Sequence, residues 1–389
     1  VGWGFGEFMA LGLFCCYNDA MSWQRGQGLN GGNSPLLQMQ GMAAVGHMKP
    51  FVEAALAAMP DGVDWGVFQA GVQKFLGQRS EVKGQTQYCE VGRVGRVALL
   101  DAGGNGPVVV VVPSMVNRGY VLDLCEGYSL VAALRERGFR MMVVDWGVPE
   151  VGKVLGVEEV VAGHLLPLLQ NAVELNEGPV NVFGYCMGGV LSVAAASMVG
   201  AGVVGKLALG AVPWDFSVTA SAGHMGAARA ALEQMAVEGQ VIPPEVLNTY
   251  FWALDPWSGV QRLMAYGRET DPARLVHMTA LETWLHDGLP LDGPVAKEML
   301  VAWYADNKPL RGEWAVQGHR VNPRTLAMPV WVAVTQHDKL VPAASSMPLV
   351  AQLPNPTVVQ VNTGHVGLVC GRKAPTLVYG PLAAWLHQG

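Results

Sequence analysis

The chain has 389 residues, of which 51% are hydrophobic and 14% are charged, with a formal net charge of −6 at pH 7. This length allows one large domain or two modest ones around a sizeable core. Because the chain is acidic and carries no basic block, we exclude nucleic acid as an expected partner.

Cysteine usage and the first residues of the chain indicate the compartment. The six cysteines, at positions 15, 16, 89, 125, 186 and 370, form neither a Cys-x-x-Cys pair nor a metal-ligand spacing. We therefore expect reduced thiols in a cytoplasmic protein. Residues 1–17 are apolar but lack a basic stretch, so we interpret them as an amphipathic lead segment and not as a signal sequence or membrane span.

The next segments are a predicted loop at 22–45 and a predicted helical region at 47–78, broken near Pro60. Alternation over residues 94–101 predicts a strand, and a glycine-rich turn follows it. Five successive valines at 108–112 are typical of a strand that is buried on both faces of a parallel sheet.

Further along, strands alternate with helices. The expected strands are 140–145, 179–183, 207–212, 329–334 and 357–361, and the expected helices are 129–137, 158–175, 190–196 and 376–387. This alternation predicts an α/β fold with a doubly wound, mostly parallel sheet.

The alternation stops between residues 215 and 325, where the sequence is helical and rich in Trp, Met and Leu; we interpret this segment as an inserted helical cap. The expected organisation is an N-terminal helical or loop region at 1–90, a core at 91–214 and 326–389, and the cap between the two core parts.

Residues 184–189 read Gly-Tyr-Cys-Met-Gly-Gly and lie between a buried strand and a helix of small residues. The pattern is typical of the nucleophile elbow of an α/β-hydrolase, with cysteine in place of serine. Such a turn strains Cys186 and projects its side chain over the sheet edge, at the positive end of the next helix, where a thiolate is stabilised. A buried structural cysteine is the alternative interpretation.

An elbow nucleophile needs an acid and a histidine later in the chain. Asp338 follows a late strand, and His365 lies in the loop after the last strand. Asp215, which follows the strand expected at 207–212, is the alternative acid. We predict a catalytic triad of Cys186, His365 and Asp338, because this chain order is that of α/β-hydrolases.

The oxyanion hole requires two backbone N–H donors. One is expected from Met187, directly after the nucleophile, and the other from the loop that follows the valine strand. Val116 is the favoured second donor, and its neighbour Met115 remains in contention.

Several segments together resemble the polyhydroxyalkanoate (poly-3-hydroxybutyrate) synthase family, from about residue 90 to the C-terminus. They are the Gly-Tyr-Cys-Met-Gly-Gly box at 184–189 and the segments at 112–124, 143–149, 337–342 and 364–367. One departure is Lys339, which stands where the family usually has histidine after the acid.

The resemblance implies an acyltransferase that polymerises 3-hydroxyacyl-CoA through an acyl group on Cys186, with release of CoA. The CoA thioester is then the substrate, and no metal or other cofactor is expected. The implied partners are the growing polyester, a second copy of the chain in a homodimer, a small partner subunit and the surface of a polymer granule.

Two alternative functions stay open at this point. A polyester depolymerase or acyl thioesterase would use the same three residues with water as the acceptor. A non-catalytic granule-associated protein would use the fold alone.

Overall fold

An eight-stranded sheet organises the described part of the chain, in the order β1-β2-β4-β3-β5-β6-β11-β12. The computed structural model describes residues 61–78, 84–218, 240–244, 247 and 256–388. β1 pairs with β2, and β2 with β4, in antiparallel fashion, whereas every other neighbouring pair is parallel, which confirms the expected mostly parallel sheet. The strands are β1 (Cys89–Val94), β2 (Val97–Gly103), β3 (Val108–Val112), β4 (Arg140–Asp145), β5 (Val180–Tyr185), β6 (Val204–Gly210), β11 (Val330–Thr335) and β12 (Thr357–Val361).

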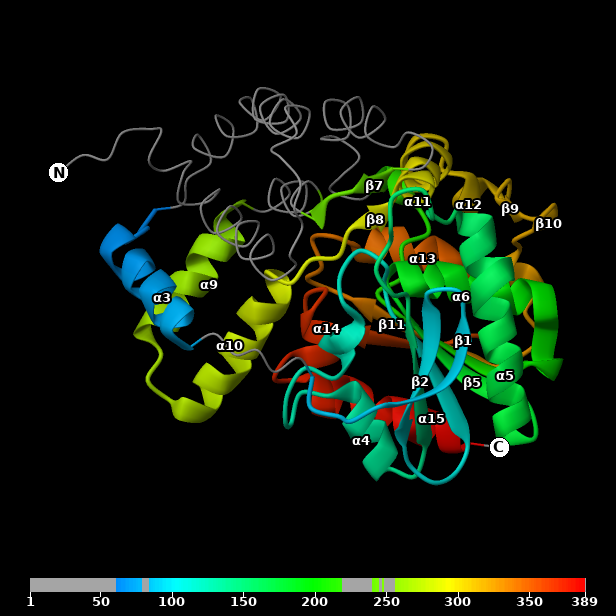
Figure 1. Ribbon diagram of the computed structural model, residues 1–389, viewed down its shortest axis with the longest axis horizontal. Helices are drawn as coiled ribbons and strands as arrows, with labels where there is room; N and C mark the ends of the chain where they lie inside the picture. Colours follow the sequence, from blue (N-terminus) through cyan, green and yellow to red (C-terminus); the bar gives the residue numbers. More distant parts are fainter. Residues whose placement is uncertain (1–60, 79–83, 219–239, 245–246, 248–255, 389) are drawn as a thin grey trace. The chain divides into compact units, whose positions relative to one another are not determined.

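Helices cover both faces of this sheet (Figure 1). The valine strand β3 shows how the two faces are divided, because Val108 and Val110 join the core cluster on one face while Val109 and Val111 join the cluster on the other. All five valines are buried, as expected for a central parallel strand. The flanking helices are α4 (Leu130–Glu136), η2 (Glu159–Leu165), α5 (Leu166–Asn176), α6 (Met187–Val199), α13 (Ala343–Gln352), α14 (Gly367–Cys370), η7 (Pro375–Tyr379) and α15 (Gly380–His387).

The bounds of most core elements agree with the sequence patterns. α4 begins after Ser129, whose hydroxyl accepts a hydrogen bond from the Ala132 amide at 2.8 Å and so caps the helix. The helix expected at 158–175 consists of η2 and α5, and the helix expected at 376–387 consists of η7 and α15. The lead segment expected at 1–17 and the loop expected at 22–45 lie outside the described residues.

The strand expected at 94–101 is wrong at its start. Val94 ends β1 and Val97 begins β2, so the two strands form a hairpin with Gly95 and Arg96 as its two-residue loop. Gly95 has a φ of 56°, a left-handed value that glycine adopts without a steric penalty and that tight hairpins require.

β6 also differs from its expected bounds of 207–212. It begins earlier, at Val204, and ends at Gly210. The chain leaves the extended conformation at Ala211, which has a φ of 49°.

The segment between β6 and β11 is mostly helical in its described part. Its helix α9 (Pro256–Arg268) packs against α3 (Trp65–Gln78), and glycines allow the backbones to approach closely: a Cβ on Gly71 would lie 1.9 Å from the Leu263 carbonyl oxygen. The other elements of the segment are η4 (Phe216–Val218), β7 (Val241–Ile242), α10 (Pro272–Leu285), β8 (Leu291–Asp292), α11 (Gly293–Glu298), η5 (Met299–Ala305), α12 (Lys308–Arg311), β9 (Ala315–Val316), β10 (His319–Arg320) and η6 (Pro323–Thr325).

Two tryptophans of this segment belong to the main core. The rings of Trp303 and Trp314 lie 5.3 Å apart, edge to face, and both side chains are 1% exposed. They join the same hydrophobic cluster as Val110 of the central strand, so they stabilise the attachment of the segment to the sheet.

Crossing a bilayer requires a length and an apolar character that none of the helices in the described ranges combines.

Candidate active site

Cys186 occupies a strained turn between β5 and α6. Its backbone has a φ of 53° and a ψ of −124°, a combination that residues other than glycine adopt rarely. This is the strained conformation that the Gly-Tyr-Cys-Met-Gly-Gly pattern predicts. The turn places the cysteine at the carboxyl end of β5 and directly before the first turn of α6, where unpaired backbone N–H groups favour negative charge.

The glycines around Cys186 are required by close contacts between strand and helix. A Cβ on Gly184 would lie 2.6 Å from the Cα of Gly189, and a Cβ on Gly188 would lie 2.2 Å from the Val112 carbonyl oxygen. A Cβ on Gly189 would lie 2.2 Å from a methyl group of Val212. All three separations are shorter than real Cβ contacts, so these positions admit only glycine without a shift of the elbow.

Asp338 and His365 meet at the same edge of the sheet. His365 Nδ1 lies 2.7 Å from Asp338 Oδ2, and the aspartate side chain is fully buried. Asp338 also accepts hydrogen bonds from the Thr335 hydroxyl at 3.0 Å and from the amides of Leu340 and Val341, both at 2.8 Å. The carboxylate is therefore held by its own loop and presents one oxygen to the imidazole.

The alternative acid, Asp215, has other partners. Its carboxylate accepts hydrogen bonds from the backbone and hydroxyl of Ser217 and from the Asn307 side chain. It therefore fixes the chain after β6 to the end of η5, and the geometry favours Asp338 as the partner of His365.

The charges around His365 favour its protonated form. Burial by itself lowers the pKa of His365, but the negative charges of Cys186 and Asp338, together with hydrogen bonds to both side chains, outweigh burial and raise the pKa to about 10. Burial likewise acts to raise the pKa of Asp338, yet the imidazole charge and the hydrogen bonds to the carboxylate keep it below its usual value. An imidazolium between a carboxylate and a thiolate is the arrangement that activates a cysteine nucleophile.

Tyr185 is a site residue that sequence reasoning missed. Its hydroxyl donates to the backbone carbonyl of His365 at 3.2 Å, and its ring lies 5.2 Å from the imidazole, centroid to centroid. It occupies the variable position of the Gly-x-Cys-x-Gly pattern, and no signal in the sequence distinguishes it from other buried tyrosines.

The two predicted oxyanion donors differ in their surroundings. Met187 is the first residue of α6, where backbone N–H groups have no partner within the helix. The amide of Val116, in the loop after β3, donates to the Ser114 hydroxyl at 3.3 Å. Its use as an oxyanion donor therefore requires that this long hydrogen bond be exchanged, and both Val116 and Met115 remain proposals.

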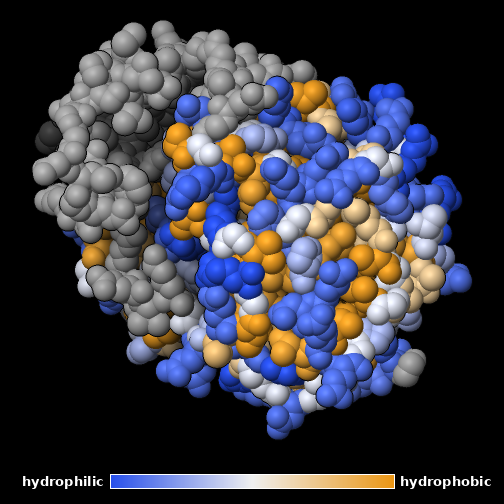
Figure 2. All heavy atoms as spheres, turned by 45° about the vertical axis from the view of Figure 1, so that its right-hand side comes forward, coloured by the Kyte–Doolittle hydropathy of each residue, from blue (hydrophilic) through white to orange (hydrophobic). Residues whose placement is uncertain are grey.

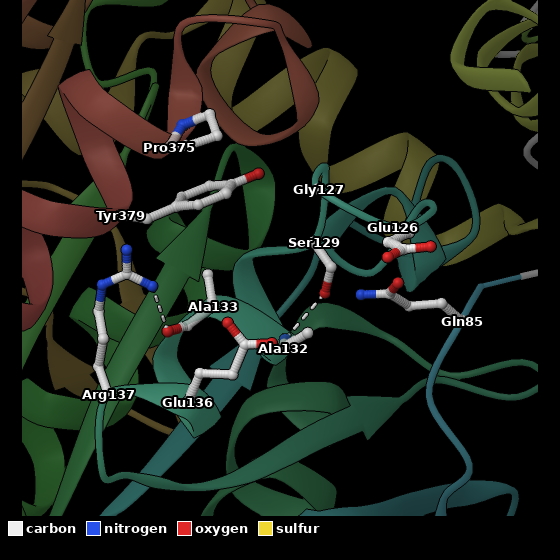
Figure 3. Close-up of a pocket in the computed structure, with 10 residues that line it drawn as sticks. All are labelled: Gln85, Glu126, Gly127, Ser129, Ala132, Ala133, Glu136, Arg137, Pro375 and Tyr379. Atoms are coloured by element: carbon white, nitrogen blue, oxygen red, sulfur yellow. Dashed lines mark hydrogen bonds between the residues drawn. The ribbon is translucent and has the colours of Figure 1, made fainter. Parts of the chain in front are cut away.

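A separate cavity of about 210 Å³ lies beside α4 (Figure 3). None of the three predicted triad residues lines it. Two of its polar side chains have partners within the protein: the Arg137 guanidinium donates to the Ala133 carbonyl at 2.7 Å, and the Ser129 hydroxyl donates to Asp123 at 2.6 Å. We assign this cavity no part in the chemistry at Cys186.

The sheet and the strained turn between β5 and α6 define the α/β-hydrolase fold, and Cys186 occupies that turn. The solved structure of BpoC from Mycobacterium tuberculosis H37Rv has the same fold, with a TM-score of 0.50 and 19% identity over 76% of this chain and 96% of that one. No protein-family model matches the chain.

Similarity to curated proteins shows the family. The poly(3-hydroxyalkanoate) polymerase subunit PhaC of Synechocystis sp. is 30% identical over 297 residues, which are 72% of this chain and 77% of the relative. The subunit PhaC of Haloferax mediterranei is 26% identical over 293 residues, and that of Allochromatium vinosum is 24% identical over 288 residues, each over 72% of this chain. The matches cover 58% of the Haloferax relative and 80% of the Allochromatium relative. The chain belongs to the poly(3-hydroxyalkanoate) polymerase family.

Proposed function

We propose that this chain polymerises 3-hydroxyacyl-CoA into polyhydroxyalkanoate through an acyl group carried on Cys186. The observation that carries the proposal is the hydrogen bond between His365 and Asp338 in a member of the polymerase family whose strained elbow holds Cys186. The contact supports covalent acyl transfer, and the family supports the choice of substrate.

The first step is acylation of the thiolate. Cys186 Sγ attacks the thioester carbonyl, a carbon–sulfur bond to the enzyme forms, and the bond to the CoA sulfur breaks. The backbone amides of Met187 and Val116 stabilise the oxyanion in between. The His365 imidazolium gives its proton to the departing CoA thiolate, so that CoA leaves as the free thiol.

The second step transfers the acyl group to a hydroxyl group. Neutral His365 removes the proton from the 3-hydroxyl of a monomer or a chain end, and that oxygen attacks the acyl carbonyl. An ester bond forms, the bond to Cys186 breaks, and the thiolate and imidazolium are restored. Asp338 holds the imidazole in the required tautomer and stabilises its charge.

A thiol nucleophile suits a polymerase because the acyl-enzyme remains activated. Exchange of one thioester for another changes the free energy little, and the second transfer to an oxygen acceptor is then favourable. Productive transfer requires that water be kept from the acyl group. The helical segment between β6 and β11 supports such exclusion, since Trp284 of α10 is 5% exposed and packs in the same core cluster as Tyr185.

The proposal includes the binding partners that the family implies, beginning with the surface of a polymer granule. Apolar side chains reach the surface among polar ones on the face shown in Figure 2, and the loop after β4 exposes 51% of Val148 and 65% of Val151. We propose contact with an apolar polyester granule because the family implies it, and the side chains of this loop could take part in that contact. A homodimer and a small partner subunit are further proposed associations.

The polymerase and the hydrolase are separated by their products. Purified protein is incubated with 3-hydroxybutyryl-CoA, and CoA release, insoluble polymer and free 3-hydroxybutyrate are measured together. The proposal predicts CoA release that matches the polymer formed. Release of CoA with only the free hydroxy acid would overturn it in favour of a hydrolase, and Cys186→Ala serves as the control for uncatalysed thioester loss.

A further inference from the structure

We propose that Trp146 and Trp284 are positioning residues that fix the two ends of the loop supplying the second oxyanion donor. The oxyanion loop is defined here as residues 113–118. The inference rests on the proposed function, in which an amide of this loop stabilises the oxyanion at Cys186.

Trp146 fixes the start of the oxyanion loop. It follows β4, is 5% exposed, and its indole Nε1–H donates to the Pro113 carbonyl at 3.0 Å. This carbonyl lies against the elbow helix, because a Cβ on Gly188 would be only 2.4 Å from the Pro113 oxygen. The peptide that Trp146 holds is therefore in direct contact with the turn that carries Cys186.

Trp284 fixes the end of the oxyanion loop. It lies near the end of α10, is 5% exposed, and its indole Nε1–H donates to the Arg118 carbonyl at 2.7 Å. The following residues reinforce this contact: Asp287 binds the Arg118 guanidinium at 2.8 Å, and Gly288 forms an antiparallel bridge with Asn117. The loop thus takes part of its shape from the segment between β6 and β11.

The two ends of the oxyanion loop meet at its base. Gly119 directly follows the loop, and a Cβ there would lie 2.9 Å from Pro113 Cγ. Between the ends, Met115 is buried and Val116 is partly buried. A loop closed at its base and held by an indole donor at each end keeps its amides in place without reorganisation, which is the property that an oxyanion hole requires.

The proposed triad and the oxyanion loop therefore come from different elements of the fold and can be perturbed separately. Cys186, His365 and Asp338 come from β5–α6 and from the loops after β12 and β11. The indoles act on the loop after β3. Loss of either indole N–H should therefore impair reactions that pass through an oxyanion and spare reactions of the same thiolate that do not.

The test compares two reactions of Cys186 in Trp146→Phe and Trp284→Phe. p-Nitrophenyl butyrate acylates the thiolate through a tetrahedral oxyanion, and the burst of p-nitrophenolate gives its rate. Iodoacetamide alkylates the same sulfur at a saturated carbon, with loss of iodide and no oxyanion, and peptide mass spectrometry gives the rate at Cys186. Trp303→Phe is the matched control, because the buried Trp303 indole N–H has no hydrogen-bond partner among the residues that the structure describes.

We expect Trp146→Phe and Trp284→Phe each to slow acylation about tenfold or more, while the rate of alkylation changes less than about twofold. Trp303→Phe should change neither rate beyond that margin. The inference would be overturned if acylation and alkylation were slowed equally, or if both Trp146→Phe and Trp284→Phe were acylated at the wild-type rate. Polymer formation from 3-hydroxybutyryl-CoA is measured separately. A wild-type protein that is acylated by the ester yet forms no polymer would contradict the proposed function. The ratio of the acylation rate to the alkylation rate would still decide the role of the indoles.

Discussion

His365 Nδ1 lies 2.7 Å from an oxygen of Asp338 that is 27 residues away in the chain. The aspartate is held independently of the histidine, because its other oxygen accepts two backbone amides from its own loop. The imidazole therefore binds to an acceptor that is already fixed, and its second ring nitrogen is left for the thiol.

Replacement of Asp338 should slow acylation severely without abolishing it. In Asp338→Asn the imidazole loses its anionic partner, and we expect a fall in kcat of about a thousandfold. The new amide group also meets backbone N–H donors, so unfolding by urea should show some loss of stability. Asp215→Asn is the matched control and should change kcat by less than about threefold; a severe loss in that variant instead would assign the acid to Asp215.

The pKa of His365 should depend on the charge of Cys186. The wild-type value is raised to about 10 because the charges of Cys186 and Asp338 outweigh the effect of burial. Cys186→Ala removes one negative charge, so the pKa of His365 should fall, and Asp338→Asn should lower it as well. The titration of the labelled imidazole followed by NMR measures this directly, and an unchanged pKa in Cys186→Ala would contradict the contact between the two side chains.

Gly188→Ala should destabilise the elbow. The added Cβ would lie 2.2 Å from the Val112 carbonyl oxygen, and such a contact can be relieved only by moving the backbone. We expect a loss of about 1–3 kcal/mol in the free energy of unfolding. Gly163→Ala in η2 is the matched control, since a Cβ there meets nothing within 4 Å; it should be neutral or slightly stabilising in the same urea titration.

Removal of the Tyr185 hydroxyl should lower kcat by more than a loss of stability alone would explain. Tyr185→Phe keeps the ring beside the imidazole and removes the donor to the His365 carbonyl, so we expect kcat to fall about threefold to tenfold with KM nearly unchanged. Tyr266→Phe is the comparison, because its buried hydroxyl bonds Thr279 and Gln78 in the packing of α9. That variant should lose about 1 kcal/mol of stability and keep its kcat. Equal kcat values for the two variants would show that the Tyr185 hydroxyl has no specific role in turnover.

Much of the core could be predicted because local signals there agree with the final contacts. The valine run of β3 and the Ser129 cap of α4 are each sufficient to set their elements. The elbow pattern likewise predicted the strained backbone of Cys186, since few turns need glycine at those spacings.

The remaining features depend on contacts between distant parts of the chain. The hairpin at Gly95 was missed because a single glycine inside an alternating segment does not by itself indicate a turn. The role of Tyr185 and the hydrogen bond of the Val116 amide depend on where a carbonyl and a hydroxyl come to lie after folding. Periodicity carries no information about either contact.

The central claim is that the sulfur of Cys186 carries the growing acyl chain. The most direct test is mass spectrometry of the peptide containing Cys186, after rapid quenching of the protein during turnover of 3-hydroxybutyryl-CoA. We predict a 3-hydroxybutyryl or oligomeric adduct on Cys186 in the wild type, and its absence in Cys186→Ala together with the loss of polymer. Polymer formed by Cys186→Ala, or an acyl adduct on another residue that turns over at the rate of polymer synthesis, would contradict the claim.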